Sequence, residues 1–120
     1  MKKVLFVEDE SALQKALTDI LTQAGYKVVS ALDGEIGLRL AKSEKPDLIL
    51  LDIILPRLNG FEVLKKLKEN PELKEIPVIV LTNLEKMEDV EKAIELGAKT
   101  YLVKTQYTID EVIEKIKKAI

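Results

Sequence analysis

The stretch LILLD at residues 48–52 decides the fold, because four consecutive apolar residues end abruptly at a carboxylate. A strand with no polar position is typical of a parallel sheet that is covered on both faces. The stretch VIVLT at residues 78–82 repeats this pattern, and VLFV at 4–7 stops in the same way at an acidic run. The sequence therefore predicts strands at 4–7, 48–51 and 78–81, with two more mixed strands at 26–31 and 100–103.

Amphipathic helices are predicted between these strands, where apolar residues recur every three or four positions. The predicted helices cover residues 11–24, 35–43, 61–69, 87–96 and 108–120, and Gly25 and Gly97 are well placed to end two of them. Alternating strands and helices predict a three-layer α/β domain with a parallel sheet. We expect the flavodoxin-like, doubly wound strand order 2-1-3-4-5, with helices on both faces and a crevice at the carboxyl ends of the first and third strands.

The composition narrows the possible functions. A chain of 120 residues without cysteine is expected to form one domain, here residues 1–120 with no output domain, and it suits a reducing cytoplasm. The absence of histidine removes the usual metal ligand and the Ser-His-Asp arrangement. With 19 basic and 21 acidic residues, the net charge of -2 argues against direct nucleic-acid binding through bulk charge. Neither a signal peptide nor a membrane segment is predicted.

Polar residues follow the carboxyl ends of four predicted strands: Glu8 and Asp9, then Asp52, Thr82 and Lys104. Taken singly, such residues commonly cap the next helix or reach solvent. Parallel strands bring their carboxyl ends to one edge, however, and three carboxylates gathered there repel one another unless a cation is present. Mg²⁺ prefers oxygen ligands and is commonly shared between carboxylates and a phosphoryl group, so it is the expected ion.

One of these carboxylates can act as a nucleophile toward phosphorus and form an aspartyl phosphate. Asp52 is the best candidate, because it ends the most apolar strand opposite the acidic pair. Phosphoryl transfer depends mainly on positioning and charge neutralisation, which the metal, the Lys104 ammonium and the Thr82 hydroxyl can supply.

The whole chain resembles the receiver domain of two-component response regulators. The matching fragments, in order, are Val7-Glu8-Asp9, Leu51-Asp52, Leu55-Pro56, Asn59-Gly60, Thr82, Gly97-Ala98 and Tyr101-Leu102-Val103-Lys104. Each fragment is weak alone, but in this order and spacing they are specific. The resemblance implies a signalling module that is not a turnover enzyme and catalyses only its own phosphorylation and dephosphorylation.

The resemblance also implies a role for each site residue. Asp52 would accept a phosphoryl group from a histidine kinase or histidine phosphotransfer protein, while Thr82 and Lys104 bind the phosphoryl oxygens. Mg²⁺ would be held by Glu8 through water, by Asp9, by Asp52 and by the backbone carbonyl of Ile54. Tyr101 would be a switch residue that moves inward together with Thr82 and alters a partner-binding face made by the fourth helix, last strand and last helix. For Tyr101, a half-buried strand aromatic with its hydroxyl in water is an equally good interpretation.

Two positions depart from the family pattern. Asn83 stands where the family usually has a small residue after the threonine, which predicts an altered phosphoryl lifetime. Thr105 stands where the family usually has a proline after a cis peptide bond. A non-proline cis bond costs about 2.5 to 4 kcal/mol, so both cis and trans remain open for Lys104-Thr105.

Three alternatives to a working receiver remain, together with one open question about the extent of the protein. A degenerate receiver would act as a phosphorylation-independent docking domain. A flavodoxin-like cofactor binder would need a phosphate loop after the first strand, where Glu8-Asp9-Glu10 would repel an anion. A phosphatase of the haloacid dehalogenase type would place an Asp-x-Asp nucleophile at that position. Finally, the receiver can be stand-alone or part of a longer protein.

Overall fold

The computed structural model describes all residues from Met1 to Ile120 and contains five strands and five α-helices in alternation. The strands are β1 (Lys3–Val7), β2 (Lys27–Ala31), β3 (Leu48–Leu51), β4 (Val78–Thr82) and β5 (Thr100–Val103). The helices are α1 (Ser11–Gln23), α2 (Gly34–Glu44), α3 (Gly60–Glu69), α4 (Met87–Glu95) and α5 (Ile109–Ala119). All five predicted strands and all five predicted helices are confirmed, and no end differs from its prediction by more than one residue.

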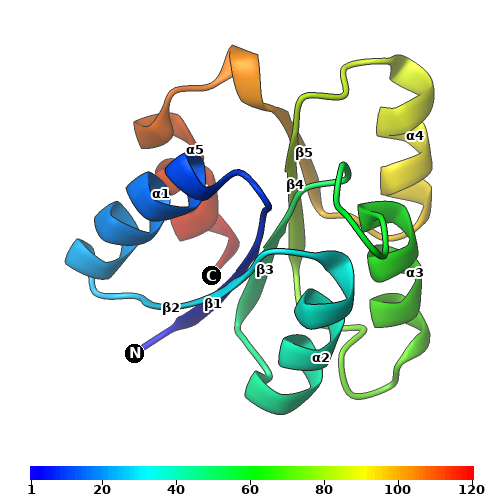
Figure 1. The fold of residues 1–120 in the computed structure, drawn as a ribbon, viewed down its shortest axis with the longest axis horizontal. Coiled ribbons are helices and arrows are strands. Elements are labelled where there is room, and N and C mark those ends of the chain that lie inside the picture. The colour runs from blue at the N-terminus through cyan, green and yellow to red at the C-terminus, as the bar shows by residue number, and fades with distance from the viewer.

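The five strands form one parallel sheet in the order β2-β1-β3-β4-β5. This confirms the doubly wound prediction. Helices α1 and α5 cover one face of the sheet, and α2, α3 and α4 cover the other (Figure 1). The strand order reverses between β1 and β3, which are hydrogen-bonded neighbours, so the loops after these two strands leave from adjacent points of the same edge.

Two hydrophobic cores lie on the two faces of the sheet, because alternate side chains of a strand point in opposite directions. In β1, Val4 and Phe6 pack with α1 and α5, whereas Leu5 and Val7 pack with α2, α3 and α4. All four side chains are fully buried, and so is every residue of β3 and β4. The central strands are thereby held rigidly, and so are the polar residues at their carboxyl ends.

The helix ends follow local capping chemistry. The side chains of Asp33, Asn59 and Thr108 accept hydrogen bonds from backbone N–H groups in the first turns of α2, α3 and α5. Gly25 and Gly97 follow α1 and α4 with φ values of 97° and 109°, a region that glycine adopts without a steric penalty. No helix in the structure combines the length and apolar character needed to cross a bilayer.

Candidate functional site

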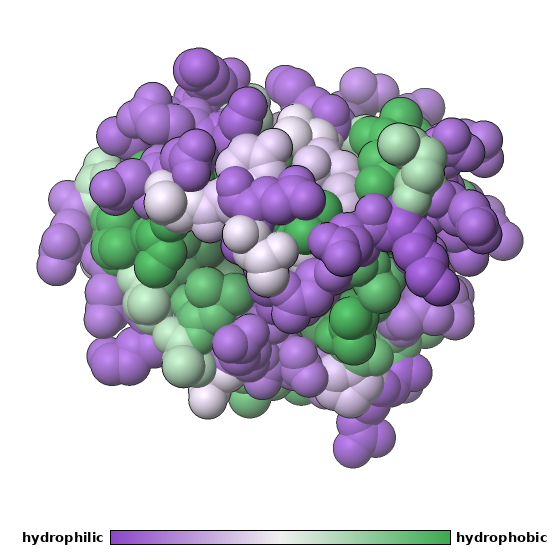
Figure 2. Space-filling model, turned by 90° about the horizontal axis from the view of Figure 1, so that it is seen from above, coloured by the Kyte–Doolittle hydropathy of each residue, from purple (hydrophilic) through white to green (hydrophobic).

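Three carboxylates meet at the carboxyl edge of the sheet. Oxygen atoms of Glu8, Asp9 and Asp52 all lie within 4.8 Å of one another. Glu8 is fully buried, Asp52 is 3% exposed and Asp9 is exposed. The cluster follows from the topology, because Glu8 and Asp9 come directly after β1 and Asp52 comes directly after its neighbour β3. Figure 2 looks onto this edge and shows hydrophilic side chains gathered between hydrophobic patches.

Lys104 supplies a cation to the cluster from the last strand. Its Nζ lies 2.8 Å from Glu8 Oε1 and donates a hydrogen bond of 2.9 Å to Asp52 Oδ2. A longer contact of 3.5 Å reaches the exposed side chain of Glu10. Burial acts to lower the pKa of the ammonium, but the carboxylates of Glu8 and Asp52 outweigh it and hold that pKa above its usual value. Lys104 is therefore firmly charged beside Asp52.

The Lys104-Thr105 peptide bond is trans, because the chain contains no cis peptide bond. Residues 104–106 form a short 3₁₀ turn instead, and this turn starts directly after β5. Lys104 still reaches across the end of β4 to Asp52. This geometry settles the question that the sequence left open.

The donor set fits a hard divalent cation. Asp52 Oδ1 accepts a hydrogen bond of 3.1 Å from the Ile54 backbone N–H, which orients this carboxylate. Glu8 Oε2 is held by the Glu10 N–H at 3.0 Å, whereas the buried Glu8 Oε1 faces the Lys104 ammonium at 2.8 Å. Burial raises the pKa of the Glu8 carboxyl to about 7, and the charge of Asp52 adds to this effect while Lys104 opposes it. Three carboxylates within 4.8 Å of one another, two of them buried and sharing one ammonium, form an environment that a divalent ion would stabilise.

Thr82 and Tyr101 both contact Leu84, in the loop between β4 and α4. The buried Thr82 Oγ1 accepts a 3.5 Å contact from the Leu84 N–H, and the Tyr101 hydroxyl donates a hydrogen bond of 2.8 Å to the Leu84 carbonyl. Burial raises the pKa of Tyr101 to about 12, with further contributions from the charges of Asp89 and Asp52. The Tyr101 ring is half-buried, and its hydroxyl has a protein partner. Asn83, which lies between Thr82 and Leu84 in the chain, is exposed to solvent.

Sequence reasoning missed Gln14, whose side chain is buried, with 7% of the residue exposed. Its side-chain amide lies beside the carboxyl ends of β1 and β2 and donates to backbone carbonyls there. A signal did exist, because Gln14 stands three and seven residues before Leu17 and Leu21, on the buried stripe of α1. A polar residue on such a stripe needs hydrogen-bond partners.

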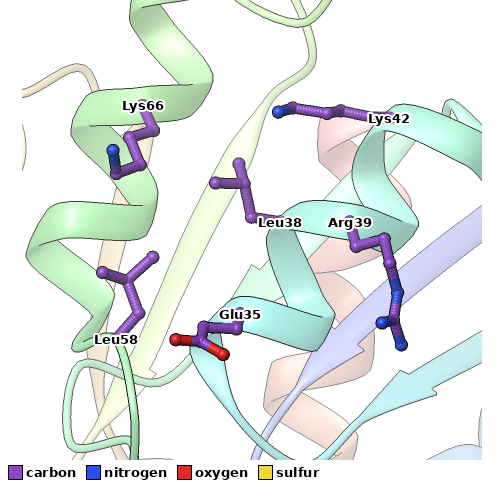
Figure 3. Close-up of a pocket in the computed structure, with 6 residues that line it drawn as sticks. All are labelled: Glu35, Leu38, Arg39, Lys42, Leu58 and Lys66. Atoms are coloured by element: carbon purple, nitrogen blue, oxygen red, sulfur yellow. The ribbon is translucent and has the colours of Figure 1, made fainter.

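A surface groove lies apart from these residues, between α2 and α3. It has a volume of about 360 Å³ and is lined by Glu35, Leu38, Arg39, Lys42, Leu58 and Lys66. Figure 3 shows Leu38 directed toward α3, with the Lys42 side chain extending beside it. None of the predicted site residues lines this groove.

Comparison with known proteins supports one family throughout. The family model described as "Response regulator receiver domain" matches residues 4–117. The chain is 42% identical over 103 residues to the alkaline phosphatase synthesis transcriptional regulatory protein PhoP of Bacillus subtilis, covering 86% of this chain and 42% of that protein. It is 38% identical over 116 residues to the polar-differentiation response regulator DivK of Brucella anthropi, covering 97% of this chain and 94% of that protein.

A similar solved structure is the Mn²⁺-bound form of the response regulator Rcp1, with a TM-score of 0.87 and 32% identity over 98% of this chain and 93% of that one. The chain spans less than half the length of the transcriptional regulators that it matches, such as PhoP, and nearly the whole length of DivK. With its parallel 2-1-3-4-5 sheet and its acidic edge, the chain belongs to the family of response regulator receiver domains.

Proposed function

We propose that residues 1–120 form a phosphoacceptor receiver domain in which Asp52 accepts a phosphoryl group from a histidine kinase or histidine phosphotransfer protein. Receiver domains work in two-component signalling and are not turnover enzymes. The observation that carries the proposal is the meeting of Glu8, Asp9 and Asp52 within 4.8 Å, with Lys104 hydrogen-bonded to Asp52.

In the proposed reaction, a carboxylate oxygen of Asp52 forms a bond to phosphorus while the phosphorus–nitrogen bond of the donor phosphohistidine breaks. The imidazole keeps the electron pair of that bond and leaves. Lys104 lies 2.9 Å from Asp52 Oδ2, where its charge can stabilise the phosphoryl oxygens, and we assign the same role to the Thr82 hydroxyl. This assignment explains why a positive side chain that is only 12% exposed stands at the end of β5.

The divalent ion that we propose for this site is Mg²⁺. Glu8, Asp9, Asp52 and the backbone carbonyl of Ile54 would hold it, with Glu8 acting through water. When bound, it would supply positive charge to the phosphoryl oxygens. The close approach of the three carboxylates, two of which are buried, supports this assignment.

The proposed switch links Thr82 to Tyr101 through Leu84. If the Thr82 hydroxyl turns toward a phosphoryl group, its contact with the Leu84 N–H is released, and the Leu84 carbonyl is the acceptor for Tyr101. The phosphoryl group thus contacts two arrangements of the loop differently, which is what a population shift requires. We propose that the face made by α4, β5 and α5 then binds a downstream protein.

The test is intact mass spectrometry after incubation with Mg²⁺ and acetyl phosphate, with Asp52→Asn as the matched control. We expect one added phosphoryl group on the wild type, dependent on Mg²⁺ and absent from Asp52→Asn. If neither protein carries an adduct and neither binds Mg²⁺, the proposal is overturned in favour of a phosphorylation-independent docking domain.

A further inference from the structure

The side chain of Gln14 clamps the backbone next to the acidic cluster. Its Nε2 donates to three carbonyl oxygens, at 3.2 Å to Phe6, 3.0 Å to Glu8 and 2.9 Å to Ala31. These carbonyls belong to the ends of β1 and β2 and to the residue that follows β1. An amide group has only two N–H donors, so the three carbonyls share them. One buried side chain from α1 therefore ties two strand ends together.

Glu8 is fixed by this clamp at both ends of its backbone. The Glu8 N–H donates to the Ala31 carbonyl at 2.9 Å, and Gln14 donates to the same oxygen. The Glu8 carbonyl accepts a hydrogen bond of 3.0 Å from Gln14 Nε2 and accepts none from a backbone N–H. This carbonyl is part of the peptide unit between Glu8 and Asp9, so its orientation sets where the backbone of Asp9 leaves the sheet.

We propose that Gln14 is a positioning residue for divalent-cation binding, acting by fixing the Glu8-Asp9 peptide so that both carboxylates meet Asp52. This inference rests on the proposed function, because it concerns the same site. Gln14 itself need not touch the ion, since its amide is directed at carbonyl groups. Residues that orient metal ligands in this way typically change metal affinity by about tenfold to a hundredfold when replaced.

The decisive variant is Gln14→Met, which keeps the length of the side chain and removes both N–H donors. We expect the dissociation constant for Mg²⁺, measured by calorimetry, to rise by about tenfold. The rate of phosphorylation by acetyl phosphate should return to within about twofold of wild type at saturating Mg²⁺, because Asp52 and Lys104 are not held by Gln14. Weaker ion binding with a preserved maximal rate distinguishes positioning of the metal ligands from general damage.

A packing variant on the same helix supplies the control. Leu21→Val lowers stability by removing buried apolar contacts of α1, and we expect its Mg²⁺ affinity to stay within about twofold of wild type. If Gln14→Met does not fold, Gln14→Asn takes its place, since it keeps the amide but is one methylene too short to reach all three carbonyls.

Wild-type Mg²⁺ affinity in a folded Gln14→Met or Gln14→Asn variant would overturn the inference. An equal loss of affinity in Leu21→Val would do the same. These results differ from failure of the proposed function, in which the wild type itself would bind no Mg²⁺ and form no adduct.

Discussion

The ammonium of Lys104 lies 2.9 Å from Asp52 Oδ2, although the two residues are 52 positions apart in the chain. Lys104 follows β5 and Asp52 follows β3, and β4 lies between these two strands. The same ammonium is 2.8 Å from Glu8 Oε1, so one side chain connects the loops after β1, β3 and β5. The acidic cluster thus contains a cation of its own.

Lys104→Met should destabilise the protein strongly when no divalent metal is present. The substitution leaves Glu8 and Asp52 buried without their counter-ion, and breaking a buried pair in this way costs about 3 to 5 kcal/mol. Urea denaturation at pH 8 in EDTA measures the loss. The matched control is Lys15→Met, whose ion pair with Asp19 is exposed and should contribute less than about 1 kcal/mol. Equal losses in the two variants would contradict the geometry of the site.

Asp52→Asn should raise the thermal midpoint in EDTA. The change removes one of three repelling carboxylates, and Lys104 keeps Glu8 as a partner. A gain of about 1 kcal/mol corresponds to a rise of roughly 4 °C in a domain of this size. Addition of Mg²⁺ should stabilise the wild type more than the variant, because a ligand stabilises the state that binds it. Differential scanning calorimetry with and without Mg²⁺ checks both effects, and a lowered midpoint with an unchanged Mg²⁺ response is the contrary result.

The order of strands and helices could be predicted because continuous apolar runs identify the buried strands. β3 covers the predicted residues 48–51, and strand ends placed at one edge bring Glu8, Asp9 and Asp52 together. Details that depend on side-chain contacts between distant segments were harder to predict from the sequence. The 3₁₀ turn at 104–106 has no local sequence signal, and its geometry matters because it starts at the residue that reaches Asp52.

The side-chain network of the site was only partly predictable. The sequence indicates which residues stand at the strand ends, but it does not show that Lys104 also approaches Glu10, or that Tyr101 donates to the Leu84 carbonyl. Such contacts depend on rotamers and on loop paths after the fold has formed. Gln14 shows the same limit, since its three acceptors come from two different strand ends.

Gly60→Ala should destabilise the protein and disturb the loop that begins at Asp52. A Cβ at position 60 would collide with the Asp52 carbonyl oxygen and would lie 2.5 Å from Ile53 Cα. Both are backbone atoms that cannot turn away, and overpacking of this kind costs about 1 to 3 kcal/mol. We expect a loss at the upper end of this range in urea denaturation, together with weaker Mg²⁺ binding.

Gly25→Ala is the control for Gly60→Ala. Gly25 has a φ of 97° but nothing within 4 Å of an added Cβ, and it lies at the far end of α1. Its replacement should cost stability through backbone strain alone and leave Mg²⁺ affinity unchanged. A Gly60→Ala protein with wild-type stability and affinity would show that the loop after Asp52 is more compliant than its close packing implies.

Tyr101 should make the protein less stable at high pH, and the sign follows from its environment. Burial raises the pKa of this hydroxyl to about 12 in the folded state, above its ordinary value of 10.0. Between these two values the unfolded chain loses the proton while the folded protein keeps it, so the free energy of unfolding falls as the pH rises. Urea denaturation at pH 9 and pH 11 should therefore show a larger loss in the wild type than in Tyr101→Phe. Tyrosinate absorbance, compared between the two proteins while both remain folded, should place the midpoint of Tyr101 near 12. A midpoint near 10 would mean that the Tyr101 hydroxyl is exposed to solvent and not buried against the loop after β4, and the proposed link between Tyr101 and Thr82 would lose its structural basis.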